Sequence, residues 1–183
     1  MNHYQDIEVF AKKWEHRNRV LARLYTQLHL KLVETQSTDI GVSFPRMEKD
    51  PGNLLRIHGS RERLESLNKT GWWQQLAESI QCAHILPTPS GVSHRSISRV
   101  RSNMSRSKLR RLQKRGSINK EGVKEYRARM CADTMGQPYV ELLSGSNGNL
   151  YRRYLQFGPS TNQQVSGAFD AFGLSSQATV PWF

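Results

Sequence analysis

The stretch VLARLYTQLHLKLVE, residues 20–34, decides the fold of the first half of this 183-residue chain. Its apolar side chains recur every three or four positions, at Leu21, Leu24, Tyr25, Leu28 and Leu32. On an α-helix of 3.6 residues per turn, this spacing places them on one face. The stretch therefore predicts an amphipathic helix that buries this face.

The segments around this helix alternate between apolar and polar residues, as half-buried strands do. Strands are predicted within 3–10, 39–45 and 53–60, and a last one within 82–86. Ser60 is a plausible N-cap for a second helix, which Gly71 breaks or kinks. The resulting order, βαββαβ, predicts an α+β protein with an N-terminal ferredoxin-like domain over residues 1–88.

A second domain is expected over residues 92–183, after the turn-rich linker PTPSG at 87–91. Its pattern predicts a polar strand at 92–101, a basic helix at 105–115 and a further helix through 123–130. Strand-like segments follow at 138–146, 149–157 and 165–175.

Positive charge is concentrated in residues 92–115. This segment has nine Lys or Arg and no acid, in a chain whose formal net charge is +12. Such a concentration favours a phosphate-rich partner, although basic proteins also use charge for solubility and for non-specific adhesion.

The predicted basic helix separates two kinds of side chain. Leu109 and Leu112 lie on one side, and the cations are Arg106, Lys108, Arg110, Arg111, Lys114 and Arg115. A solvated surface helix would usually intersperse acids, and this one has none, so we interpret it as an anion-binding helix. The sequence offers neither a helix-turn-helix pattern nor zinc ligands, which favours an RNA hairpin over DNA.

Arg99 and Arg101 project to the same side of a strand, because they are two residues apart. Arginine pairs bidentately with guanine, so these two could read bases near the end of a stem. Two phosphate contacts are the alternative.

No cofactor, metal site or membrane attachment is expected. Cys82 and Cys131 are isolated, and the fifteen acids are scattered. No apolar run approaches the roughly 20 residues of a membrane span, and the first residues are unlike a signal peptide, so a cytoplasmic location is expected.

His29 and Ser144 are candidates for catalysis. RNA can be cut when its own 2′-OH attacks the neighbouring phosphate, and a side chain titrating near neutrality must then take that proton. A hydroxyl in the Gly-rich loop at 144–148 could orient the 2′-OH. The alternatives are a packing histidine and an ordinary hairpin turn.

Motifs along nearly the whole chain resemble the CRISPR repeat-processing endoribonucleases of the type I-F system. They are LxxxLH at 24–29, IGVSFP at 40–45, SRVxS at 98–102, LRRLxKR at 109–115, AFGLS at 171–175 and VPWF at 180–183.

The resemblance implies a metal-independent enzyme that cuts precursor CRISPR RNA at the base of the repeat hairpin. It leaves 5′-hydroxyl and 2′,3′-cyclic phosphate ends and stays bound to the product beside the other subunits of a surveillance complex. It further implies that His29 takes the 2′-OH proton, Ser144 holds that hydroxyl, Arg99 reads a base and the Tyr151 ring stacks on a nucleotide.

Two positions depart from the family pattern. Phe172 stands where the family has an active-site tyrosine, so the ring is kept and the hydroxyl is lost. Arg101 stands where the family has a glutamine, so it could contact a different base or a phosphate. Phe172 leaves open a non-catalytic RNA-hairpin-binding structural protein, and a transcription factor is a more distant alternative.

Overall fold

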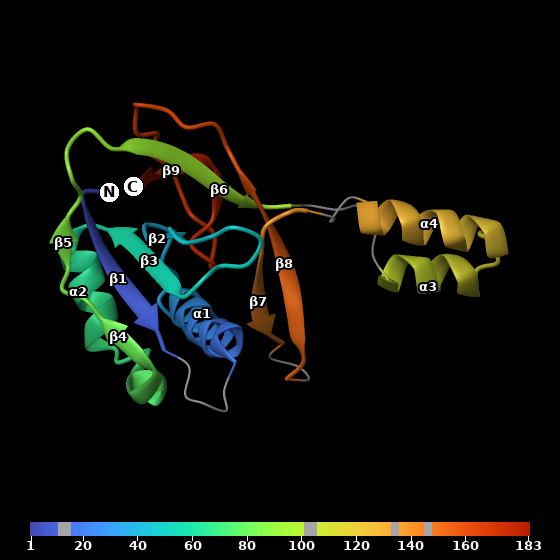
Figure 1. Cartoon of the computed structure of the whole chain (residues 1–183), viewed down its shortest axis with the longest axis horizontal. Coiled ribbons are helices and arrows are strands. Elements are labelled where there is room, and N and C mark those ends of the chain that lie inside the picture. Colours follow the sequence, from blue (N-terminus) through green and yellow to red (C-terminus); the bar gives the residue numbers. More distant parts are fainter. Residues whose placement is uncertain (11–15, 101–105, 133–135, 145–147) are drawn as a thin grey trace. The chain divides into compact units, whose positions relative to one another are not determined.

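A computed structural model describes residues 1–10, 16–100, 106–132, 136–144 and 148–183. The chain forms two compact units (Figure 1). The first combines Met1–Arg99 with Pro138–Phe183, and the second is Val100–Gln137. Within the described residues, no helix is both long enough and apolar enough to cross a membrane.

The first half of the chain forms one antiparallel sheet with two α-helices. Its elements are β1 (His3–Val9), α1 (Arg17–Glu34), β2 (Gly41–Ser43), β3 (Leu54–Gly59), α2 (Arg61–Lys69), the 3-10 helix η1 (Gln74–Ser79), β4 (Ile80–Cys82) and β5 (Leu86–Pro87). The strand order is β2-β3-β1-β4, and β5 also pairs with β1. The βαββαβ order of the main elements is therefore the expected one. The Ser60 side chain caps α2 by accepting a hydrogen bond from the Arg63 amide, as predicted.

The second sheet is also antiparallel and has the order β7-β8-β6-β9. Its strands are β6 (Ser93–Arg99), β7 (Tyr139–Leu143), β8 (Leu150–Phe157) and β9 (Ser175–Trp182). The strand predicted at 165–175 is wrong: the chain there is irregular, and β9 begins where that segment ends. The physical reason is a turn at 170–173, in which the Asp170 carboxylate accepts backbone hydrogen bonds that a sheet ladder would otherwise use.

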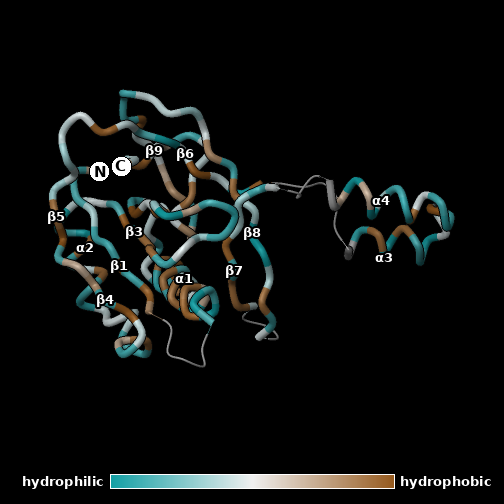
Figure 2. Tube along the Cα trace, viewed as in Figure 1, coloured by the Kyte–Doolittle hydropathy of each residue, from teal (hydrophilic) through white to brown (hydrophobic). Residues whose placement is uncertain are grey.

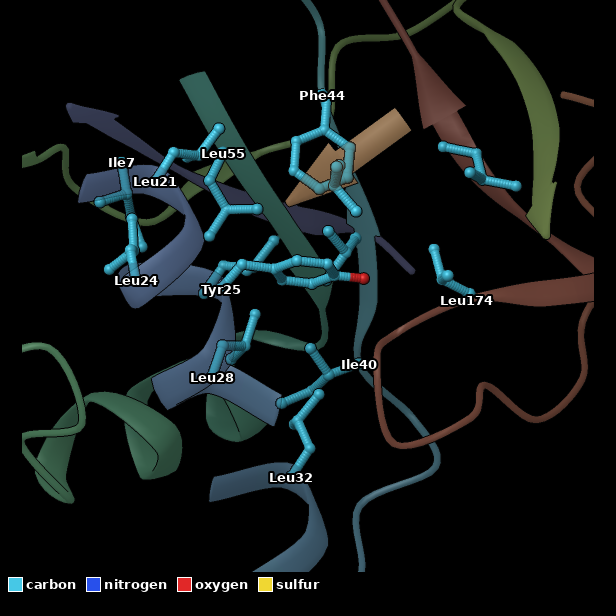
Figure 3. Close-up of a cluster of buried hydrophobic side chains, with 14 of the residues drawn as sticks. Ile7, Leu21, Leu24, Tyr25, Leu28, Leu32, Ile40, Phe44, Leu55 and Leu174 are labelled. Atoms are coloured by element: carbon cyan, nitrogen blue, oxygen red, sulfur yellow. The ribbon is translucent and has the colours of Figure 1, made fainter. Parts of the chain in front are cut away.

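Both sheets contribute to one hydrophobic core (Figure 3). Ile7, Leu28 and Ile57 from the first half pack in the same cluster as Val140, Leu155 and Val180 from the second half. The first compact unit therefore does not end at the expected boundary near residues 88–92. The linker-like sequence at 87–91 connects the first sheet to the second, and apolar residues before and after it are buried in the same core.

The second unit consists of the helices α3 (Arg106–Lys114) and α4 (Lys120–Ala132). Leu109 and Tyr126 are its buried hydrophobic side chains among the described residues. Gly116, with a φ of 67°, ends α3, and the Asn119 side chain accepts a hydrogen bond from the Gly122 amide at the start of α4. In Figure 2, α3 alternates between hydrophilic and short hydrophobic stretches, as expected for a helix with one packing face.

Candidate active site

Helix α1 carries both a core tyrosine and His29. Tyr25 is fully buried and lies edge-on to Phe44, with ring centroids 5.3 Å apart. Its hydroxyl points out of the hydrophobic cluster toward the segment that holds Leu174 (Figure 3) and donates a hydrogen bond of 2.7 Å to the Phe172 carbonyl. Burial raises the pKa of Tyr25, so the hydroxyl keeps its proton and remains a donor.

His29 is one turn further along α1 and is only partly buried. Its Nδ1 lies 2.8 Å from the carbonyl oxygen of Ala171. A carbonyl oxygen can only accept, so in the neutral ring Nδ1 carries the proton and Nε2 carries the lone pair. Within the described part of the chain, Nε2 has no hydrogen-bond partner. The arrangement holds the imidazole in the tautomer that can accept a proton at Nε2.

Phe172 stacks on the imidazole of His29. The two ring centroids are 3.6 Å apart and the ring planes differ by 11°. The backbone of the 171–172 segment therefore fixes the imidazole through the Ala171 carbonyl, while the next side chain fixes its plane. Neither contact requires the hydroxyl group that a tyrosine would have at position 172.

The turn at 170–173 positions Ala171 and Phe172. One oxygen of Asp170 accepts hydrogen bonds from the amides of Phe172 and Leu174, at 2.8 and 3.0 Å. Gly173 has a φ of 69°, and a Cβ added there would lie 2.5 Å from a Val42 methyl carbon. Both the conformation and the space thus require glycine at this position.

The second sheet brings Ser144, Tyr151 and Arg99 to one face. Tyr151 pairs with Leu142, two residues before Ser144, and Arg99 pairs with Leu155. Paired residues and residues two apart share a face, so all three lie on the face that also carries the buried side chain of Leu155. Tyr151 is 41% exposed, so its ring is available for stacking.

Helix α1 contacts this sheet next to Ser144. The amide of Leu143 donates a hydrogen bond of 3.1 Å to the hydroxyl of Thr26, one turn before His29. The end of β7, next to Ser144, is therefore tied to the turn of α1 that precedes the imidazole. The same helix therefore contacts both the 170–173 turn, through His29, and the end of β7 next to Ser144, through Thr26.

The candidate RNA-binding cations on α3 are exposed. Solvent reaches the side chains of Lys108, Arg110, Arg111, Lys114 and Arg115, whereas Leu109 is buried. Arg106 is the first residue of α3. Arg101 lies outside the described residues. The separation into a packing side and a cationic side agrees with the expected pattern, and RNA binding by these side chains stays a prediction.

Arg153 is a residue of this region that the sequence analysis missed. It lies on β8, two residues from Tyr151, and is 8% exposed. Its guanidinium carbon is 3.5 Å from the centroid of the Phe172 ring. The signal was available in LYRRYLQF, where Arg153 occupies a position that strand alternation reserves for the buried face.

The described residues contain no group of three His, Cys, Asp or Glu side chains arranged to hold a metal ion. The chemical groups that the candidate site does present are an imidazole in a fixed tautomer, an aromatic stack, a buried guanidinium and Ser144, whose carbonyl accepts a hydrogen bond from the Gly148 amide.

Comparisons with known proteins agree with the motifs in the sequence. The model of the family described as "CRISPR-associated protein (Cas_Csy4)" matches residues 4–183. The CRISPR-associated endonuclease Cas6/Csy4 of Escherichia coli (strain UTI89 / UPEC) is 34% identical to this chain, with full coverage of both proteins. The protein of the same name from Pseudomonas aeruginosa (strain UCBPP-PA14) is 30% identical, again over the full length of both.

Among solved structures, the CRISPR endoribonuclease Cse3 bound to a 19-nucleotide RNA matches with a TM-score of 0.37 and 13% identity. The match covers 99% of this chain and 100% of that one. A TM-score this low supports no conclusion. The family assignment rests on the family model and on the two full-length relatives. The chain belongs to the Cas_Csy4 family of CRISPR-associated proteins, the type I-F repeat-processing endoribonucleases that its motifs resemble.

Proposed function

We propose that this protein is a metal-independent endoribonuclease that cuts precursor CRISPR RNA at the base of the repeat hairpin. The two full-length relatives named CRISPR-associated endonuclease support RNA processing in general. The observation that supports the mechanism is the hydrogen bond between His29 Nδ1 and the Ala171 carbonyl, because it leaves Nε2 as a proton acceptor at a partly exposed position.

In this mechanism the RNA supplies its own nucleophile. His29 Nε2 takes the proton from the 2′-OH, and the 2′ oxygen attacks the adjacent phosphorus. The bond between phosphorus and the 5′ oxygen breaks, and that oxygen takes a proton from water. The hydroxide formed in this step takes the proton from His29, which restores the neutral imidazole. The products are a 2′,3′-cyclic phosphate and a 5′-hydroxyl.

The other residues bind and orient. Ser144, next to the Thr26–Leu143 hydrogen bond, would hold the 2′-OH toward His29. Tyr151 would stack on the nucleotide at the cut, and Arg99 would contact the end of the stem. Phe172 has no hydroxyl, so its part is to hold the imidazole by stacking.

We assign the main recognition of the hairpin to α3. Its exposed cations would neutralise phosphates along the groove, and Arg101 would add a base or phosphate contact. In this assignment β1–β4 with α1 and α2 form a ferredoxin-like support. Tight binding through α3 would also keep the cut RNA bound, as a subunit of a surveillance complex must.

The test uses the repeat RNA of the source organism's CRISPR array, with the protein in excess chelator. We expect cleavage at one position, and we expect a single 2′-deoxy substitution at that position to abolish cleavage while binding persists. Loss of cleavage on metal removal would contradict the mechanism. Binding without any cleavage of the all-RNA hairpin would favour a structural RNA-binding subunit, the alternative that the missing Phe172 hydroxyl supports.

A further inference from the structure

Arg153 is a buried cation that has no acidic partner among the described residues. Its side chain lies in the first compact unit and is 8% exposed. Its Nε is buried and has no hydrogen-bond partner, and among the described residues no carboxylate lies within ion-pair distance of it. A charge in this position is unfavourable unless another group compensates it.

Neither ionisable neighbour pairs with this charge. Tyr25 is near enough to interact electrostatically with Arg153, but burial raises the pKa of its hydroxyl, which is neutral and donates to the Phe172 carbonyl. Asp170 forms no ion pair with Arg153, and one of its carboxylate oxygens accepts hydrogen bonds from two backbone amides of its own turn. The Phe172 ring offers a cation–π contact, which compensates the charge only in part.

Arg153 and His29 lie on opposite faces of the Phe172 ring. The guanidinium carbon is 3.5 Å from the ring centroid and the imidazole centroid is 3.6 Å from it. Two planar groups at such distances on the same face would overlap. The Phe172 ring therefore lies between the Arg153 guanidinium and the His29 imidazole. A group at the edge of this ring can contact both.

We propose that Arg153 is an anion-binding residue of the cleavage site and that its ligand is the scissile phosphate of the RNA. The inference rests on the proposed function, in which the 2′-OH of that same linkage lies at His29. Negative charge on the phosphate oxygens grows as the 2′ oxygen attacks, and a preorganised cation in a site shielded from water stabilises it. Arg153 thus provides a buried positive charge that the described residues compensate only in part.

The most direct test is a binding cycle that needs no cleavage. A hairpin RNA with one 2′-deoxy nucleotide at the cut carries either the normal phosphodiester or a neutral methylphosphonate at that linkage. We expect the wild-type protein to bind the methylphosphonate roughly tenfold more weakly, the usual scale of one charged hydrogen bond. Arg153→Met should bind both RNAs with the affinity of the wild type for the neutral one.

Arg152→Met is the matched control, because it removes the same charge from the neighbouring residue. Arg152 points to the other face of β8, is exposed and pairs with Glu141 at 3.4 Å. Its variant should retain the wild-type discrimination between the two RNAs. An Arg153→Met protein that also retains this discrimination would overturn the inference.

Folding is checked separately by thermal unfolding. Because the variant replaces a buried charge that is compensated only in part with an apolar side chain of similar length, Arg153→Met should unfold at the same temperature as the wild type or higher. If it does not fold, Arg153→Gln is measured by the same binding criterion. Failure of the wild type to bind the hairpin would contradict the proposed function itself, whereas binding without coupling to the phosphate charge contradicts only the role of Arg153.

Discussion

The imidazole Nδ1 of His29 lies 2.8 Å from the carbonyl oxygen of Ala171, a residue 142 positions away in the chain. The contact joins the middle of α1 to a turn before β9, and it selects the tautomer in which Nε2 accepts a proton. The function of the site therefore depends on the rigidity of a backbone turn as much as on the histidine.

This dependence makes Asp170 a positioning residue. Asp170→Ala removes the acceptor of the Phe172 and Leu174 amides, so the Ala171 carbonyl and the Phe172 ring lose their fixed places. We expect single-turnover cleavage to slow roughly tenfold, with hairpin affinity unchanged. Asp170→Asn keeps an acceptor oxygen and should cleave near the wild-type rate. Equal losses in both variants would mean that the carboxylate charge, rather than the turn, matters.

Two substitutions at Phe172 distinguish the role of the aromatic ring from that of the missing hydroxyl. Because the ring stacks face to face on His29, Phe172→Tyr should change the cleavage rate less than about threefold, whereas Phe172→Leu should slow it roughly tenfold by releasing the imidazole. The measurement is single-turnover cleavage at saturating protein. A large gain in Phe172→Tyr would show that a hydroxyl here takes part in the chemistry.

The cations of α3 are tested through salt dependence. Replacing Arg111 and Arg115 with Ala should weaken hairpin binding and lower the slope of log affinity against log salt by roughly one to two, since each phosphate contact releases counterions. The control replaces Arg61 and Lys69, which are exposed on α2, and removes the same charge. Equal slopes in the α3 variant and the wild type would place RNA binding elsewhere.

The burial of His58 predicts that acid lowers the stability of the folded state. It is fully buried, with Nε2 2.8 Å from the Ser43 hydroxyl oxygen, and burial lowers its pKa from 6.5 to about 3, helped by the nearby charge of Arg56. The unfolded chain binds this proton below pH 6.5 and the folded chain does not. The stability of the folded state is therefore full above pH 6.5 and falls as pH decreases toward about 3.

The measurement is urea unfolding as a function of pH. For one proton the loss approaches about 1.4 kcal/mol per pH unit well below pH 6.5. His58→Gln, which keeps a hydrogen-bonding side chain opposite Ser43, should flatten this part of the curve. Parallel curves for the variant and the wild type would assign the acid sensitivity to other groups.

The elements of the first half could be predicted because their signals are local. The leucine spacing of residues 20–34 lies inside α1, and Ser60 caps α2 as its sequence position indicated. The strand expected at 165–175 could not be distinguished from a turn by hydrophobicity alone. Asp170 and Gly173 decide this segment through backbone hydrogen bonds and a left-handed conformation, which depend on Val42 and the rest of the fold.

The residues of the candidate site, too, could be predicted from the sequence only in part. His29 and Ser144 were candidates from chemistry and family resemblance, and Arg153 could have been found as a cation at a buried strand position. The Ala171 carbonyl could not be found, because any residue supplies one and only the packing of α1 against the 170–173 turn gives it a role. A compact unit that joins residues 1–99 to 138–183 is likewise a product of tertiary packing.

The central claim is that His29 removes the proton from the 2′-OH and takes little part in holding the RNA. The measurement that tests it most directly is single-turnover cleavage by His29→Ala, with hairpin affinity determined in parallel. We predict cleavage slowed by about 10² or more, with affinity within about threefold of the wild type, because a general base contributes to the rate and α3 to the binding. Cleavage by His29→Ala at the wild-type rate would contradict this account and make His29 a packing residue.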